Sequence, residues 1–283
     1  MKAYLDLLQY VLDNGEHTKN RTGIDTIAVS GYHLKHDMRE GFPLLTTKKM
    51  GIKSILAELE FFIQGYTDKQ WLKDRNCHIW DEWCNPKKVQ YATDEETKAK
   101  MAAERDLGKI YGYQWRNFDG NDDFRGTDQL KTLIENIKKD PTSRRLIVSA
   151  WNPNQLNEMA LPPCHLGFEV LCYPESGYMD LIYAMRSNDL FLGCPYNIAS
   201  YACLLLLIAK ETGYTPRYVE AMLGNTHIYV NHLDQVKEQL SREPKKLPTL
   251  EITNFTGLFN WKYTDHILTG YDPHPKISAD VAI

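Results

Sequence analysis

The 283-residue sequence has no CxxC pair, no excess of positive charge and no apolar run long enough to cross a bilayer. Without a CxxC pair, the six cysteines give little support to a zinc site or to a thioredoxin-like redox motif, and no metal is expected. The formal net charge of −4 provides no general positive field, so we expect no nucleic-acid partner. A nucleotide-sized anion could still be bound by a few local arginines.

The sequence also lacks the features of a targeting segment. Residues 1–15 mix Lys2, Asp6 and Asp13 with apolar positions, which differs from the charged-then-apolar order of a signal peptide. The longest mostly apolar run, residues 198–209, is too short to span a membrane. We therefore expect a cytoplasmic protein with no membrane partner, whose cysteines remain reduced thiols.

The chain contains no internal repeat or low-complexity linker, which predicts a single domain over residues 1–283. Apolar spacing predicts helices at 3–13, 48–64, 127–139, 197–212 and 230–241, with Gly65 and Gly213 as stop signals. Alternation and β-propensity predict strands at 26–34, 146–151, 166–172 and 178–185. Residues 85–106 are polar and charge-rich, which predicts a solvated helical or loop excursion. Since strands and helices mix without regular alternation, the predicted fold class is α+β.

One cysteine lies in a setting that favours chemistry. Cys164 follows two prolines and precedes His165 in the run Leu-Pro-Pro-Cys-His at 161–165. Proline fixes φ and cannot donate to a sheet, so the pair presents Cys164 from a rigid turn. A thiol there becomes a useful nucleophile when a nearby cation lowers its pKa. From this run alone, a buried structural cysteine is an equally good interpretation.

Arginine clusters favour the catalytic interpretation. Arg144 and Arg145 stand ahead of a predicted strand, Arg186 and Ser187 close another, and Arg21 lies in a turn with Thr-Gly. Arginine binds phosphate through paired hydrogen bonds, and serine adds a hydroxyl donor. Adjacent arginines are usually solvated surface charges, but three such groups exceed what a surface needs.

Other polar residues have both a structural and a functional interpretation. Asn197 is either a helix N-cap or an amide that matches the edge of an imide-like base. His227 and Tyr229 are two residues apart, so a strand would direct both to one face. Glu58 is flanked by an apolar helical stripe, and it is either an exposed carboxylate or a buried acid.

Taken together, these segments resemble the thymidylate synthase family over nearly the whole chain except 85–106. The matching motifs, in sequence order, are Arg-Thr-Gly (21–23), Phe-Pro-Leu-Leu-Thr-Thr-Lys-Lys (42–49), Ile-Trp-Asp-Glu-Trp (79–83), Tyr-Gly (111–112), Gln-Trp-Arg (114–116), Ser-Arg-Arg (143–145), Leu-Pro-Pro-Cys-His (161–165), Arg-Ser-Asn-Asp (186–189), Pro-Tyr-Asn-Ile-Ala-Ser-Tyr (195–201), Gly-Tyr-Asp-Pro-His-Pro (270–275) and Val-Ala-Ile (281–283).

The resemblance implies a twofold homodimer with a mixed sheet at its interface, and dUMP as the substrate. It further implies 5,10-methylenetetrahydrofolate as carbon donor and reductant. Cys164 would add to C6 of the uracil ring, making C5 nucleophilic toward the folate methylene. Loss of the C5 proton and hydride transfer from the folate would then give dTMP and dihydrofolate.

The resemblance also implies a role for each site residue. The catalytic group would be Cys164, Glu58, Tyr111, His165 and Asn197, with Glu58 organising water and Tyr111 as the candidate base at C5. The nucleotide would be bound by Arg21, Arg186, Ser187, Asn188, Asp189, Asn197, His227, Tyr229 and the partner's Arg144 and Arg145. The folate would be bound by Lys48, Gly51, Ile79, Trp80, Trp83, Asp189, Gly193, Tyr196, Ala282 and Ile283.

Departures from the family pattern leave a second hypothesis open. The protein would then be a pyrimidine-nucleotide 5-hydroxymethylase, which adds water instead of hydride in the last step. Met185 replaces the usual glutamine and favours this alternative. Trp80 and the C-terminal Val-Ala-Ile are present as in the family, where they help to exclude water from the closed site, and this argues against the hydroxymethylase. Asn197, in place of aspartate, favours a uracil base. A catalytically inactive, RNA-binding homologue is a third hypothesis, but such a protein would be expected to lose the thiol or the arginines.

Overall fold

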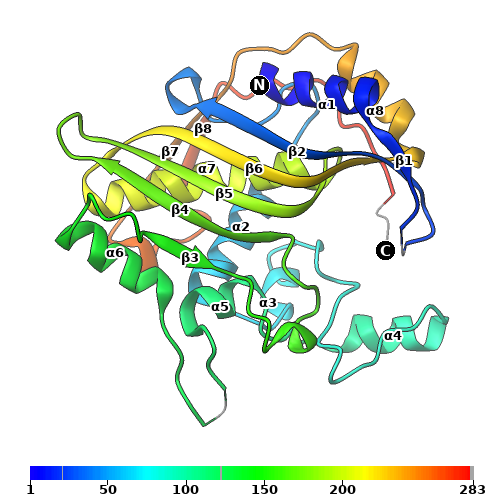
Figure 1. Ribbon diagram of the computed structural model, residues 1–283, viewed down its shortest axis with the longest axis horizontal. Helices are drawn as coiled ribbons and strands as arrows, with labels where there is room; N and C mark the ends of the chain where they lie inside the picture. Colours follow the sequence, from blue (N-terminus) through cyan, green and yellow to red (C-terminus); the bar gives the residue numbers. More distant parts are fainter. Residues whose placement is uncertain (21, 122, 281–283) are drawn as a thin grey trace.

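The computed structural model describes residues 1–20, 22–121 and 123–280. A six-stranded mixed sheet forms its centre, with strand order β1-β2-β6-β5-β4-β3 (Figure 1). These strands are β1 (Glu16–Thr18), β2 (Thr26–Asp37), β3 (Ile147–Ser149), β4 (His165–Tyr173), β5 (Tyr178–Asp189) and β6 (Thr215–Tyr229). Only the β5–β6 pair is parallel in this sheet. A separate hairpin joins β7 (Thr249–Ile252) and β8 (His266–Thr269).

Helices cover one face of the sheet, with α7 and α2 behind it in the view of Figure 1. The described helices are α1 (Lys2–Asn14), α2 (Ile52–Gln64), α3 (Gln70–Lys73), α4 (Glu95–Ala103), α5 (Tyr111–Asn117), α6 (Gln129–Lys139), α7 (Gly193–Thr212) and α8 (Leu233–Leu240). The predicted α+β class with a mixed sheet flanked by helices is therefore confirmed.

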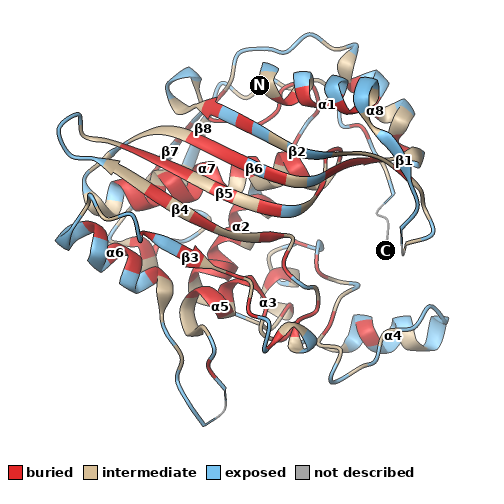
Figure 2. Cartoon of the chain, viewed as in Figure 1, coloured by how far each residue is buried: buried red, intermediate tan, exposed pale blue. Residues whose placement is uncertain are grey.

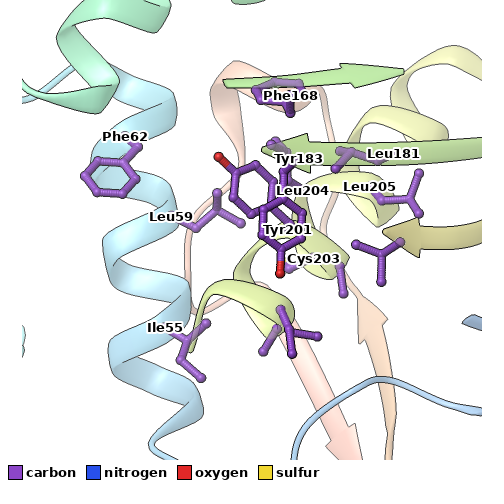
Figure 3. Close-up of a cluster of buried hydrophobic side chains, with 14 of the residues drawn as sticks. Ile55, Leu59, Phe62, Phe168, Leu181, Tyr183, Tyr201, Cys203, Leu204 and Leu205 are labelled. Atoms are coloured by element: carbon purple, nitrogen blue, oxygen red, sulfur yellow. The ribbon is translucent and has the colours of Figure 1, made fainter. Parts of the chain in front are cut away.

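The core forms where α2 and α7 meet the sheet. Figure 3 shows Leu59 of α2 directed toward Tyr201 of α7, beside Tyr183 of β5, whereas Phe62 lies on the opposite side of α2. The rings of Tyr183 and Tyr201 stack with centroids 4.2 Å apart. Close packing of these elements fixes the geometry of the polar side chains that α2 and α7 carry.

Helix α7 differs from its prediction in both length and start. It has 20 residues and begins at Gly193 rather than at Asn197, so Asn197 lies in the second turn and is not the N-cap. By length and composition, α7 is apolar enough to cross a membrane, contrary to the sequence-based expectation, but most of it is buried inside the protein. A helix that is apolar on nearly all sides is typical of a core position.

Most of the other predicted elements are confirmed with shifted boundaries. Gly65 and Gly213 end their helices in the left-handed conformation, with φ of 72° and 81°. Helix α2 begins at Ile52, not at residue 48. The 85–106 segment contains α4, whose only buried residue is Met101 (Figure 2). Strand β5 continues to Asp189, four residues beyond its predicted end, and this extension contributes to the site.

Candidate active site

Cys164 lies just before β4, in a turn fixed by main-chain hydrogen bonds. Its N–H donates to the Tyr111 hydroxyl at 2.9 Å, and its carbonyl accepts from the Arg186 N–H at 2.9 Å. The side chain is partly exposed, whereas Cys77, Cys84, Cys194 and Cys203 are buried. The remaining cysteine, Cys172, is partly exposed as well, but burial raises its pKa to about 11. Cys164 is therefore the thiol best placed to act as a nucleophile.

The Arg186 side chain stabilises the same turn. Its Nε and Nη2 atoms donate to the carbonyls of Pro163 and Pro162, both at 2.8 Å. The guanidinium also lies 5.6 Å from the centre of the Trp151 ring. The structure thus places a permanent positive charge beside the cysteine turn, as the sequence predicted, although two of its donors already have backbone partners.

Glu58, on α2 and partly exposed, pairs with the buried indole of Trp80. The Trp80 Nε1–H donates to Glu58 Oε1 at 2.7 Å. Burial raises the pKa of Glu58 to about 7, and the Trp80 hydrogen bond offsets only part of that effect. Near neutral pH the carboxyl therefore exists in both protonation states, as an acid–base group requires.

This pKa predicts that Glu58 costs stability at alkaline pH. The folded-state pKa of about 7 lies above the ordinary 4.5, so ionisation of Glu58 is less favourable in the folded chain than in the unfolded chain. The resulting loss of stability grows as the pH rises from 4.5 to about 7 and is complete above pH 7. Glu58→Gln should therefore raise the unfolding free energy at pH 8 by up to about 3 kcal/mol, and hardly change it near pH 4.5. Urea unfolding at both pH values tests this, with exposed Glu82→Gln as control. An equal effect of Glu58→Gln at both pH values would contradict the prediction.

Tyr111 and His165 stack beneath the cysteine turn. Their ring centroids are 4.0 Å apart and nearly parallel, and His165 Nδ1 lies 2.6 Å from the Tyr201 hydroxyl. Burial lowers the pKa of His165 to about 3, so this imidazole is neutral at physiological pH. Burial also raises the pKa of Tyr111 well above its usual range. His165 is thus placed to support Tyr111 rather than to take up a second proton and become charged.

The parallel strands β5 and β6 bring the next group together at their carboxyl ends. Their register pairs Ser187 with Asn225 and Asp189 with His227. The Nδ1 atom of His227 lies 2.7 Å from Asn225 Oδ1, and burial lowers the pKa of His227. The rings of His227 and Tyr229 meet with centroids 5.2 Å apart, which confirms that both lie on one face of the strand.

The turn from β5 into α7 is fixed by Asp189. One of its carboxylate oxygens accepts from the N–H groups of Phe191 and Leu192, at 3.0 and 3.2 Å. The helix then begins at Gly193, and a Cβ at that position would lie 3.7 Å from Asn197 Oδ1. Asp189, Gly193 and Asn197 are therefore neighbours, as a shared binding site requires.

Two predicted residues, Asn188 and Lys48, have buried side chains with partners inside the protein. Asn188 is fully buried, and its Nδ2 contacts Met185 Sδ at 2.8 Å. Lys48 is also buried, not solvated: its ammonium donates to the Phe191 carbonyl and lies 3.6 Å from that ring's centre. Burial lowers the pKa of Lys48 to about 8. Their roles in binding nucleotide or folate remain predictions.

The described residues that we predicted to bind folate lie on three segments, 48–51, 79–83 and 189–196. Ile79 is 42% exposed, Trp80 is buried, and the partly exposed Trp83 packs against Tyr91 with ring centroids 6.1 Å apart. The first and third segments approach each other, because a Cβ at Gly51 would lie 3.5 Å from the Tyr196 hydroxyl. Gly51 and Tyr196, both predicted to bind folate, thus lie side by side.

Five predicted residues are placed elsewhere or not described. Arg144 and Arg145 are exposed in the turn before β3. Arg21, Ala282 and Ile283 lie outside the described residues. No group of three or more His, Cys, Asp and Glu side chains in the described ranges could hold a metal ion.

Sequence reasoning did not identify two supporting residues. Tyr201 contacts His165, and Asn225 contacts His227. Asn225 stands two positions before His227, and strand periodicity could have assigned it to the same face. Nothing in the local sequence pairs Tyr201 with His165, because α7 and β4 meet only in the folded chain.

The fold and the site define an α+β enzyme in which a partly exposed thiol stands in a fixed turn, and Tyr111 and Trp80 connect that turn to the carboxyl of Glu58. Comparison with known proteins gives the family. A family model described as "Thymidylate synthase" matches residues 2–283. The chain is also 45% identical over 298 residues to the thymidylate synthase of Mycoplasma genitalium, with all of both chains covered. The chain belongs to the thymidylate synthase family. It is a methyltransferase that converts dUMP to dTMP, and the hydroxymethylase alternative is not favoured.

Proposed function

We propose that Cys164 carries out this methylation by adding to C6 of dUMP. The observation that supports the proposal is the pair of hydrogen bonds that fix the Cys164 turn, one to Tyr111 and one to Arg186. Addition of the thiolate to C6 moves electron density to C5, which can then attack a one-carbon donor. In this family 5,10-methylenetetrahydrofolate is that donor, and it also supplies the hydride of the final step.

Proton transfers in the proposed mechanism use Tyr111 and Glu58. Continuous contacts link them to the thiol: Tyr111 bonds to the Cys164 amide, its ring lies 6.1 Å from that of Trp80, and Trp80 bonds to Glu58. Glu58 exchanges protons near pH 7 through water. Tyr111, held by its stack on His165, is the candidate base that removes the C5 proton. Because burial raises its pKa, the phenol is neutral, so it would pass its own proton to water as it accepts the proton from C5.

Nucleotide recognition follows the carboxyl ends of β5 and β6. We assign the phosphate to Arg186, Ser187 and Arg21, the uracil edge to Asn197, and the ribose hydroxyl to His227 and Tyr229. The β5–β6 register supports this assignment because it brings Ser187 and His227 to one end of the sheet. Ligands of sheets with parallel strands commonly bind at such carboxyl ends.

The folate would lie over the exposed Ile79 and against the Trp80 turn. The closeness of Gly51 to Tyr196 supports this position, because it brings two of the predicted folate-binding residues side by side. The donors and apolar surfaces match a flat heteroaromatic ring with polar edges.

We further propose that a second copy of the chain covers the free face of the sheet. An apolar hollow of about 310 Å³ lies there, lined in part by Ile147, Ile182 and Met222, and Ile147 and Met222 are each more than half exposed. Since β3 pairs Ile147 with Glu169, Arg145 lies about seven residues, or roughly 20 Å, along β4 from Cys164. An arginine cannot span that distance, so Arg144 and Arg145 would serve the partner's site.

A cytoplasmic location, where thiols stay reduced, fits the mechanism.

Product analysis tests the proposed function. The enzyme with dUMP and 5,10-methylenetetrahydrofolate should yield dTMP and dihydrofolate in equal amounts, with no product when dCMP replaces dUMP. Chromatography identifies the nucleotide, and absorbance follows dihydrofolate. A hydroxymethyl nucleotide formed without dihydrofolate would instead identify the water-adding reaction.

A further inference from the structure

Lys69 is buried to an extent that is rare for lysine. It precedes α3, and its residue surface is only 1% exposed. No carboxylate in the described part of the chain forms an ion pair with it. Its ammonium instead donates to three main-chain carbonyls, those of Asp81 at 2.8 Å, Trp83 at 2.7 Å and Met101 at 2.9 Å. A lysine has three N–H donors, so every donor has one partner.

The three carbonyls belong to two segments that are distant in sequence. Asp81 and Trp83 lie in the turn that follows Trp80, here called the tryptophan turn (residues 78–85). Met101 lies in α4, within the 85–106 excursion. The Lys69 N–H also donates to the Arg105 carbonyl at 2.8 Å. One residue thus joins the excursion to the tryptophan turn, and its loss would leave three inward-facing carbonyls without a charged partner.

The side chain of Trp80 connects the tryptophan turn to Glu58 and Tyr111, the two residues to which we assign the proton transfers. Trp80 donates to Glu58 at 2.7 Å, and its ring meets that of Tyr111 at 6.1 Å. The turn cannot shift without moving the indole that holds Glu58. A displacement of about 1 Å in such a group can lower a rate about 10²-fold.

We propose that Lys69 is a positioning residue: its buried ammonium fixes the tryptophan turn so that Trp80 holds Glu58 in its working orientation. The 85–106 excursion then has a function as well, since α4 supplies one of the three acceptors. This inference rests on the proposed roles of Trp80 and Glu58.

The test compares Lys69→Met with Lys73→Met. Methionine fills similar space without donors, and Lys73 is a matched control because its ammonium donates to the neighbouring Ala102 carbonyl, at 3.2 Å, from a more exposed position. Lys69→Met should lower kcat/KM for 5,10-methylenetetrahydrofolate by about 10- to 100-fold. It should also speed amide hydrogen exchange in residues 78–85 and 101–106. Lys73→Met should change both by less than about twofold. Lys69→Gln, which keeps two donors, should be intermediate and serves if Lys69→Met does not fold.

A double-mutant cycle with Trp80→Phe separates positioning from general stabilisation. If Lys69 acts through Trp80, the double variant should be little worse than the worse single variant. Fully additive losses would overturn the proposal, as would an unchanged kcat/KM in Lys69→Met. If Trp80→Phe alone leaves turnover unchanged, the proposed role of the Trp80–Glu58 pair fails. If amide hydrogen exchange is still faster in the Lys69 variants, Lys69 stabilises the tryptophan turn without affecting the active site.

Discussion

Replacement of Cys164 by serine should lower kcat by at least about 10³-fold, because a serine hydroxyl is a far weaker nucleophile than a thiolate. The substitution removes no group that we assign to the phosphate or the ribose. Nucleotide binding should therefore persist, and calorimetry should give a dUMP affinity within about tenfold of that of the unmodified enzyme. Loss of turnover with retained binding is the result expected for a nucleophile.

The matched control is Cys172→Ser. Cys172 is the other partly exposed cysteine, but burial raises its pKa to about 11, and it lies within β4 rather than in the turn before it. Its substitution should change kcat by less than about twofold. Mass spectrometry of the enzyme trapped with a 5-fluoro analogue of dUMP should locate the adduct on Cys164. Full turnover in Cys164→Ser, or an adduct on another cysteine, would remove the nucleophile assignment.

Local sequence signals predicted the elements of this fold better than their boundaries. Gly65 and Gly213 marked the helix ends because a left-handed C-cap favours glycine whatever surrounds it. The start of α7 was placed four residues late, since Asn197 is a good N-cap residue and the actual first turn contains Pro195. Propensity could not show that tertiary contacts favour the earlier start.

The site divides in a similar way. The run of Cys164 and its prolines could be recognised from local chemistry as a candidate reactive turn, but only the arginine clusters and the family resemblance favoured catalysis over a structural cysteine. The raised pKa of Glu58 could not be predicted from the sequence, because it depends on burial that only the folded chain provides. The buried amines of Lys48 and Lys69 escaped prediction for the same reason: lysine usually indicates surface, and only the folded chain shows the carbonyls that receive them.

The second large effect concerns Arg144 and Arg145. Replacing both with alanine should lower kcat/KM for dUMP by about 10²- to 10⁴-fold, because each charged hydrogen bond to phosphate contributes about 1.5–3 kcal/mol. Both side chains are exposed in the turn before β3, so the folded state should change little. Thermal unfolding provides that check. Lys138→Ala and Lys139→Ala, at the end of nearby α6, control for a general loss of positive charge.

Mixed dimers show whether these arginines act in the partner's site. In a dimer of one Cys164→Ser chain and one Arg144→Ala/Arg145→Ala chain, the arginines of the first chain would complete the intact cysteine site of the second. If the chains exchange at random, half the dimers are mixed and each has one complete site, so activity should recover to about a quarter of that of the unmodified enzyme. If the arginines serve their own chain, no mixed dimer has a complete site and activity stays at the level of the separate variants. The roughly 20 Å between Arg145 and Cys164 along the sheet favours recovery.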